Sequence, residues 1–205
     1  MKLFPVVRQS IIKAQEVGLG ASRVPFRIVE AVLDLSSRPP RSISYEEDAG
    51  VDVVEPCLLK DCLGSGGSEE GSLSVGFPTP LRLRRQGKYL GKMDWPFFFA
   101  TLARRLEALN ILFHKDDLLG KETWKRLSDQ FSRPGEIEGE LHWQDRSRYS
   151  SRQKSTIPQG GLVGEVVFRS PEPWVFEWLR AAELVHVGKG ASMGLGCVRI
   201  GAGKE

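Results

Sequence analysis

The chain has 205 residues, 40% of them hydrophobic and 27% charged, which is typical of one or two globular domains and excludes a disordered tail or a fibre. Its 29 Lys and Arg residues barely exceed its 26 Asp and Glu residues, so the protein is not uniformly basic, although a local basic patch is allowed. Three cysteines exclude a disulfide framework, and no apolar run is long enough to cross a bilayer, so we expect a cytoplasmic protein with no membrane partner.

The N-terminal part predicts a helix followed by strands. Apolar residues recur at three- and four-residue spacing over 3–17, as in an amphipathic helix, and Gly18 ends the pattern. A run rich in β-branched residues over 26–35 predicts a strand, which we expect Pro39–Pro40 to end. Residues 42–55 have room for one or two short strands.

We expect a domain boundary at 64–71, where Gly and Ser residues gather. After it, apolar and basic residues alternate over 72–85 and predict a strand. Because neighbouring side chains of a strand point to opposite faces, Arg82 and Arg84 are expected to share one face.

A helix, a second short helix and two strands are predicted next. Asp94 can cap the first helix, with Pro96 in its first turn. A second helix is expected around 117–131. The alternation over 137–144 predicts a strand with one buried face, and another strand is expected at 162–168.

The last elements predicted are a helix that starts at Ser170–Pro171, a Gly-rich loop at 188–196 and a strand at 196–200. The order of elements from residue 72 onward is then β-α-(α)-β-β-α-β. This order is that of an α+β, ferredoxin-like domain (βαββαβ), for which we give the bounds 72–205.

A short motif occurs twice. Gly-x-Gly-Ala-Ser stands at 18–22 and again at 188–192, each time after an amphipathic helix and before a strand that contains Arg-Ile. The repeat indicates two related domains, of which residues 1–63 form only the last part, a partial second copy at the N-terminus. We therefore expect the C-terminal part of a longer protein, a truncated product, or a chain whose first half a partner supplies.

The Gly-rich loop allows two interpretations. Glycines let backbone N–H groups approach an anion, and a lysine adds charge, but the order helix–loop–strand excludes the nucleoside triphosphate and dinucleotide sites, which leaves an RNA or DNA backbone. Alternatively, the loop is a tight connection that needs glycine only for positive φ. The glycines concerned are Gly188, Gly190, Gly194 and Gly196.

Two basic stretches, 82–92 and 146–154, favour nucleic-acid binding. Cations bind phosphates, hydroxyl groups can reach 2′-hydroxyls, and Tyr149 can stack on a base. In a chain of net charge +3 such runs mean that positive charge is segregated. The first stretch also contains Lys92, and the cations that we expect to bind RNA are Arg82, Arg84, Arg85, Lys88, Arg146, Arg148, Arg152 and Lys154.

Catalysis would need a base. His142 lies on the predicted solvent face of its strand, and imidazole suits the removal of a proton from a 2′-hydroxyl. Tyr149 and Lys154 are further catalytic candidates, whereas His186 fits a structural role at a helix end and His114 a surface position. Since no pair of histidines has metal-ligand spacing, we expect neither a metal nor a cofactor.

Several segments together resemble the C-terminal region of the sixth Cas family, the CRISPR-associated RNA endonucleases of the RAMP superfamily. The resemblance covers about 72–201, with 3–35 as the tail of a first RAMP domain. The segments that carry it are Phe77–Leu83, Trp143 with Arg148–Gln153, Gly160–Gly164 and His186–Gly196.

The resemblance implies tandem ferredoxin-like domains that bind CRISPR repeat RNA and cut it without metal, by attack of the 2′-hydroxyl on the adjacent phosphate. It implies that Lys189 and Ser192, with Arg148, Arg152 and Gln153, hold RNA. In this family the general-base histidine usually lies in the first domain, so none of the histidines here is assigned by motif. The alternative is a non-catalytic RNA-binding subunit or scaffold of a Cas ribonucleoprotein, with other Cas subunits or a second copy as partners. A third is a protein-interaction module that pairs through an exposed sheet edge.

Overall fold

The structure is a computed structural model that divides into two compact units, residues 1–65 and 66–205. The predicted helix at 3–17, apart from the helical Val17, lies outside the described residues, as do most of 26–35 and 42–55. The structure describes Val17 and the ranges 32–35, 38–42, 71–114, 119–150 and 153–202.

In the first unit, β1 (Val32–Leu35) and β2 (Arg38–Ser42) form an antiparallel hairpin. The strand predicted at 26–35 ends at Leu35, as expected, but Pro39–Pro40 do not end strand structure there, because both lie within the next strand, β2. The register shifts there, so that the two prolines lie opposite the single residue Asp34. A residue without an N–H group is tolerated at such a bulge, where the ladder is already interrupted.

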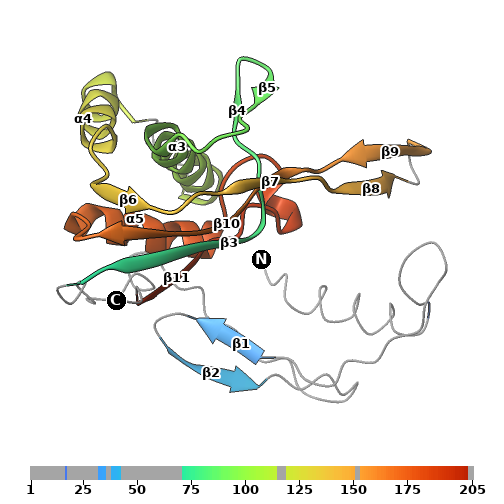
Figure 1. The fold of residues 1–205 in the computed structure, drawn as a ribbon, viewed down its shortest axis with the longest axis horizontal. Helices are drawn as coiled ribbons and strands as arrows, with labels where there is room; N and C mark the ends of the chain where they lie inside the picture. Colours follow the sequence, from blue (N-terminus) through green and yellow to red (C-terminus); the bar gives the residue numbers. More distant parts are fainter. Residues whose placement is uncertain are drawn as a thin grey trace. The chain divides into compact units, whose positions relative to one another are not determined.

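The second unit is built on an antiparallel sheet (Figure 1). Its strands are β3 (Leu73–Leu81), β6 (Glu136–Glu138), β7 (His142–Gln144), β10 (Gly161–Arg169) and β11 (Arg199–Ala202). Their order is β11-β3-β10-β6, with β7 also paired to β10, so the first and third strands of the motif lie in the middle. The predicted α+β, ferredoxin-like fold is confirmed.

The strand predicted at 137–144 is divided into β6 and β7. Both pair with β10 in one continuous register, since Val167 faces Glu138 and Leu162 faces Trp143. Gly139 interrupts the ladder because its φ of +94° is left-handed. The expected buried face ends early: the Trp143 side chain is 39% exposed and donates its Nε1–H to Asp145.

The described part of this unit also contains three α-helices: α3 (Trp95–His114), α4 (Lys121–Phe131) and α5 (Pro173–Val185). Helix α3 contacts both α4 and α5, and aromatic rings fill the space between the helices. The sheet and all three helices contribute fully buried residues to the core, among them Val75, Phe77, Phe98, Phe99, Leu102, Phe131, Phe168, Val175 and Leu179.

The two long helices begin differently. Asp94 caps α3 as predicted, because its Oδ1 accepts the N–H of Phe97 at 3.0 Å. Helix α5 begins at Pro173 and not at Ser170–Pro171, since Ser170 has a φ of +44° that no helical residue adopts. None of the described helices combines the length and apolar character that a membrane span requires.

Removal of the α3 cap has a predictable cost. Asp94→Ala is expected to lower the free energy of unfolding by about 1 kcal/mol, because the first turn loses its acceptor. Asp94→Asn should lose only a few tenths, since Asn caps equally well and the exposed ion pair with Arg85 contributes little. Urea denaturation measures both. Equal losses in the two variants would mean that the ion pair, not the cap, stabilises the helix.

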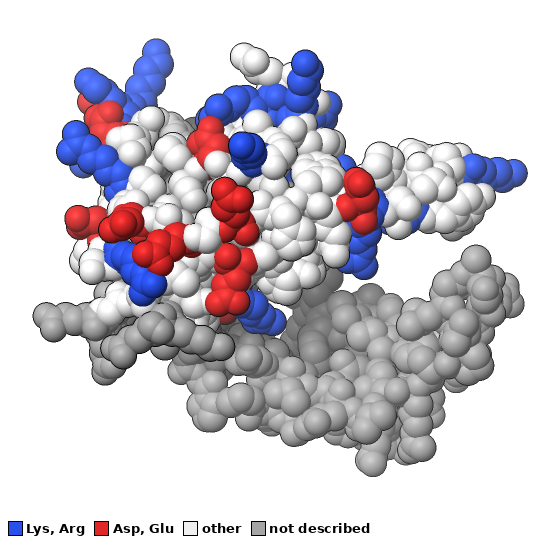
Figure 2. Space-filling view, viewed as in Figure 1, with Lys and Arg blue, Asp and Glu red and all other residues white. Residues whose placement is uncertain are grey.

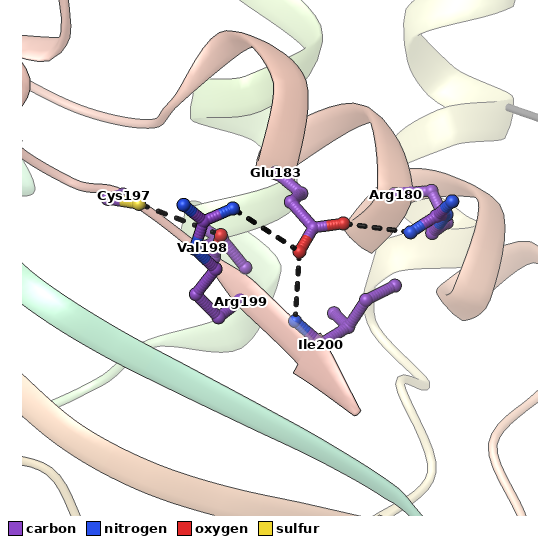
Figure 3. A network of polar contacts seen from close by, with 6 residues as sticks. All are labelled: Arg180, Glu183, Cys197, Val198, Arg199 and Ile200. Carbon is purple, nitrogen blue, oxygen red and sulfur yellow. Dashed lines mark hydrogen bonds and ion pairs between the residues drawn. The ribbon is translucent and has the colours of Figure 1, made fainter. Parts of the chain in front are cut away.

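Strand β11 is an edge strand held to helix α5 by Glu183 (Figure 3). The Glu183 carboxylate accepts the N–H of Ile200 at 3.3 Å and an Nη1–H of Arg180 at 2.9 Å. Arg199 lies at 4.0 Å from the same carboxylate. At the other edge, Arg169 of β10 donates to Glu138 of β6 at 2.7 Å, and this hydrogen bond lowers the pKa of the Glu138 carboxyl. Side chains thus fasten both outer strands.

Two hairpins project from the sheet (Figure 1): β4 (Arg84–Arg85) with β5 (Lys88–Tyr89), and β8 (Ser147–Ser150) with β9 (Ser155–Pro158). The prediction of one strand over 72–85 is wrong, because β3 ends at Leu81 and Arg84 and Arg85 belong to the first hairpin. There the backbone leaves β3, because Arg82 pairs with Gly188 in an isolated parallel bridge. Arg82 and Arg84 therefore share no strand face.

Candidate nucleic-acid interface

The Gly-rich loop is clamped onto the end of β3. It contains a short 3-10 turn, η1 (Ala191–Met193). The N–H of Lys189 donates to the carbonyl of Arg82 at 2.9 Å, and the N–H of Gly196 donates to the carbonyl of Pro80 at 3.0 Å. Residues 188–196 and the segment after Leu81 therefore form one continuous backbone support.

The loop glycines are required by backbone geometry, which is the second of the two interpretations above. All four have positive φ. A Cβ on Gly188 would lie 2.7 Å from the Arg82 carbonyl oxygen, and one on Gly196 would lie 1.8 Å from the Val187 carbonyl oxygen. No L side chain fits at Gly196 without backbone movement.

The loop presents side chains outward rather than a row of amides. The N–H groups of Lys189, Met193, Gly194, Leu195 and Gly196 all donate to carbonyls of the protein itself. The exposed side chains are those of Lys189, Ser192 and Met193. Binding of a phosphate by this loop thus stays a prediction, with the Lys189 ammonium and the Ser192 hydroxyl as its donors.

The strand predicted at 196–200 starts later than expected, at Arg199. The N–H of Cys197 donates at 2.9 Å to Oγ1 of Thr79, whose hydroxyl donates in turn to the carbonyl of Gly194. Here a side-chain hydroxyl of β3 takes the place of the backbone carbonyl that would accept this N–H in a continued β3–β11 pairing. It ties the end of the loop to β3.

The β4–β5 hairpin presents cations around one aromatic ring. The guanidinium carbon of Arg82 lies 4.3 Å from the centroid of the Tyr89 ring, and that of Arg84 lies 5.9 Å from it. Arg85 instead pairs with Asp94 at 2.9 Å and lies over Phe97. On this hairpin, Arg84 and Lys88 are exposed and form no ion pair with a described acidic residue.

Tyr89 was missed by the sequence reasoning. It is 37% exposed, and its position inside the basic stretch 82–92 was the available signal, because an aromatic residue among cations is typical of nucleic-acid binding.

The β8–β9 hairpin carries the second basic stretch. Arg148, Tyr149 and Lys154 are exposed on it, with Tyr149 at 62%. Gln153 donates its N–H to Oγ of Ser150 and so closes the turn. Arg152 lies outside the described residues. Arg146, at the base of the hairpin, is exposed, and its carbonyl accepts the N–H of Gln159.

Arg82 does not lie on the surface with the other cations. It is 7% exposed, and its Nη2 donates to the carbonyl of Pro158, the last residue of β9, at 3.0 Å. The predicted binding residue is thus a buried link between the two hairpins and the Gly-rich loop.

Charge is segregated on the face seen in Figure 2. Acidic side chains gather over β6 and β10, where Glu136, Glu138, Glu140 and Glu165 are exposed. Lys and Arg side chains gather over the β4–β5 hairpin, at the end of the β8–β9 hairpin and over α4. A polyanion is attracted to the hairpins and repelled by the strands beside them.

The candidate catalytic residues are not brought together with a helper group. His142 is exposed on β7, as predicted, and its imidazole forms no hydrogen bond with another described residue. His186 ends α5 with a φ of +57°, and its Nδ1 is buried without a partner in the described structure. His114 is the last residue of α3. Within the described ranges, no three His, Cys, Asp or Glu side chains are arranged to hold a metal ion.

Residues 75–198 match the family of the CRISPR-associated endoribonuclease Cas6. The chain belongs to this family. Comparison with curated proteins gave no match.

Among solved structures, the Cas6 product complex of Thermus thermophilus is similar over 96% of this chain and 70% of its own, with 18% identity and a TM-score of 0.53. A second Cas6 product complex is similar over 68% of this chain and 55% of its own, with 23% identity and a TM-score of 0.47. A further Thermus thermophilus Cas6 structure is similar over 65% of this chain and 55% of its own, with 16% identity and a TM-score of 0.44. The chain thus spans about half the length of two of these Cas6 chains. At 18% identity, the first likeness concerns the fold.

Proposed function

We propose that this chain binds CRISPR repeat RNA and takes part in its endonucleolytic processing. The observation that carries the proposal is the convergence at the end of β3, where the Gly-rich loop, the β4–β5 hairpin and the base of the β8–β9 hairpin meet through Arg82. Membership of the Cas6 family supports RNA as the polyanion.

The RNA backbone is expected to run across the exposed cations of this surface. The cations expected to neutralise phosphates are all exposed: Arg84 and Lys88 on one hairpin, Arg148 and Lys154 on the other, and Lys189 on the loop. The exposed ring of Tyr149 offers a face on which a splayed base can stack. Gln153, exposed at the turn of the second hairpin, is a further candidate. For Arg152 the proposal rests on the family resemblance alone.

The proposed reaction is metal-independent. A base removes the proton from a 2′-hydroxyl, and the resulting alkoxide attacks the adjacent phosphorus, which releases the 5′-oxygen and leaves a cyclic phosphate. His142 is the first candidate for the base, since it is exposed and precedes the β8–β9 hairpin. Tyr149 and Lys154 are candidates for protonation of the leaving oxygen or for charge stabilisation.

His142→Ala tests the enzymatic part of the proposal. If this chain is itself the enzyme, we expect cleavage of repeat RNA to slow by about 10²–10⁴-fold, the usual contribution of a general base, with RNA affinity unchanged within about twofold. Gln144→Ala, on the same face of β7, is the control and should cleave normally. Single-turnover assays in EDTA measure both. Unchanged cleavage by the His142 variant would exclude His142 as the base.

A non-catalytic RNA-binding subunit or scaffold of a Cas ribonucleoprotein is the second candidate. It is favoured by the solitary position of His142, because a catalytic base is usually oriented by another hydrogen-bonding group. RNA binding without cleavage, restored to cleavage by another Cas subunit, would support it.

We further propose the organisation of the chain. Residues 1–63 are the last part of a first ferredoxin-like domain, and 72–205 form a complete second one. The partners are repeat RNA and other Cas subunits or a second copy of the chain, in the cytoplasm.

A further inference from the structure

Arg82 is a buried cation at the junction of the interface. Only 7% of the surface of Arg82 is exposed to solvent. No carboxylate among the described residues forms an ion pair with it. Its Nε is buried without a hydrogen-bond partner. Burial of a charge at such a cost indicates a role that an apolar residue could not fill.

The side chain and backbone of Arg82 contact all three parts of the interface. Its Nη2 donates to the Pro158 carbonyl at the base of the β8–β9 hairpin. Its guanidinium lies over the ring of Tyr89 in β5. Its carbonyl accepts the N–H of Lys189 in the Gly-rich loop. Each hairpin is a two-stranded sheet of its own, and Arg82 contacts both of them.

We propose that Arg82 is a positioning residue, which holds the two cation-bearing hairpins and the Gly-rich loop at a fixed spacing for the phosphates of one RNA strand. The inference rests on the proposed RNA-binding function. Arg82 itself is not expected to bind a phosphate, because its Nη2 donates to Pro158, its guanidinium lies over Tyr89, and only 7% of the residue is exposed.

Lysine cannot replace arginine in this role. The planar guanidinium donates to a carbonyl while it stacks on a ring, whereas an ammonium offers only a point charge. Arg82→Lys therefore separates positioning from charge. A direct phosphate contact would survive this substitution and a fixed spacing would not.

A double-mutant cycle with Arg148→Ala tests the coupling. Arg148→Ala alone removes one phosphate contact and should weaken RNA binding about fivefold at about 0.1 M salt. In the Arg82→Met background the same change should matter less than about twofold, because the hairpin is no longer held in register. Arg84→Met is the control: it removes an exposed guanidinium beside the same ring and should add to Arg148→Ala without coupling.

Amide hydrogen exchange in the free protein gives a readout independent of RNA. The N–H of Gln159, the residue after Pro158, donates to the Arg146 carbonyl. This N–H should exchange at least about tenfold faster in Arg82→Lys and Arg82→Met than in the unmodified chain. Its exchange rate should be unchanged in Arg84→Met. If Arg82→Met does not fold, Arg82→Lys carries both tests. Additive effects of Arg82 and Arg148, or unchanged exchange at Gln159, would overturn the inference. Failure of the unmodified chain to bind RNA would overturn the proposed function, and exchange would then decide the role of Arg82 alone.

Discussion

Removal of four exposed cations from the hairpins is expected to weaken binding of repeat RNA by about 10²–10³-fold at about 0.1 M salt. The variant combines Arg84→Ala, Lys88→Ala, Arg148→Ala and Lys154→Ala. Each lost contact with a single strand removes about 0.7 from the slope of log K against log salt, so the slope should fall by about 3. All four side chains are exposed, so the fold should be kept.

The chain offers a control of equal charge. Lys121, Lys125, Arg126 and Arg133 are exposed on and after α4, and their replacement by alanine changes the net charge by the same amount. If RNA binds at the hairpins, this control should weaken binding by less than about fivefold, since distant exposed charges are screened at this salt concentration. Equal losses in the two variants, measured by filter binding, would mean that only net charge matters.

Gly196→Ala is expected to destabilise the second unit by at least about 3 kcal/mol. The new Cβ would lie 1.8 Å from the carbonyl oxygen of Val187, at a backbone φ of +62°. Relief of this clash must break the bonds that Gly196 makes with Val187 and Pro80, and so release the loop from β3.

Gly194→Ala isolates the backbone strain from the clash. Gly194 has a φ of +82° in the same loop, but a Cβ there meets nothing within 4 Å. We expect a loss of only about 1 kcal/mol in this variant, from the left-handed conformation alone. Urea denaturation compares the two, and similar losses would show that the Val187 contact is easily relieved.

Local sequence signals predicted the main elements of the second unit. The cap at Asp94, the alternation over 137–144 and the β-branched strand at 162–168 each depend on neighbouring residues, so the element order and the ferredoxin-like fold could be predicted from sequence. Pro39 and Pro40 were read as strand breakers because the bulge that accommodates them depends on a partner strand.

The sequence indicates candidate residues for an interface, but it does not give their arrangement. Strands β4 and β5 have two charged or aromatic residues each, and β8 is mainly polar, so neither hairpin shows an apolar alternation that a sequence reveals. Arg82 was read as a surface cation because its burial depends on Gly188, Pro158 and Tyr89, which are remote or separated by a turn.

We propose above that this chain recognises CRISPR repeat RNA through the hairpins and the Gly-rich loop. The most direct test incubates the chain with labelled repeat RNA in EDTA and reads a native gel beside a denaturing gel. We expect a shifted complex, from which unlabelled repeat RNA displaces the label and unrelated RNA of equal length does not. Cleavage with a cyclic-phosphate end would place the base within these residues, and a shift alone would favour the scaffold. The absence of any shift, or equal displacement by unrelated RNA, would mean that this chain does not recognise repeat RNA.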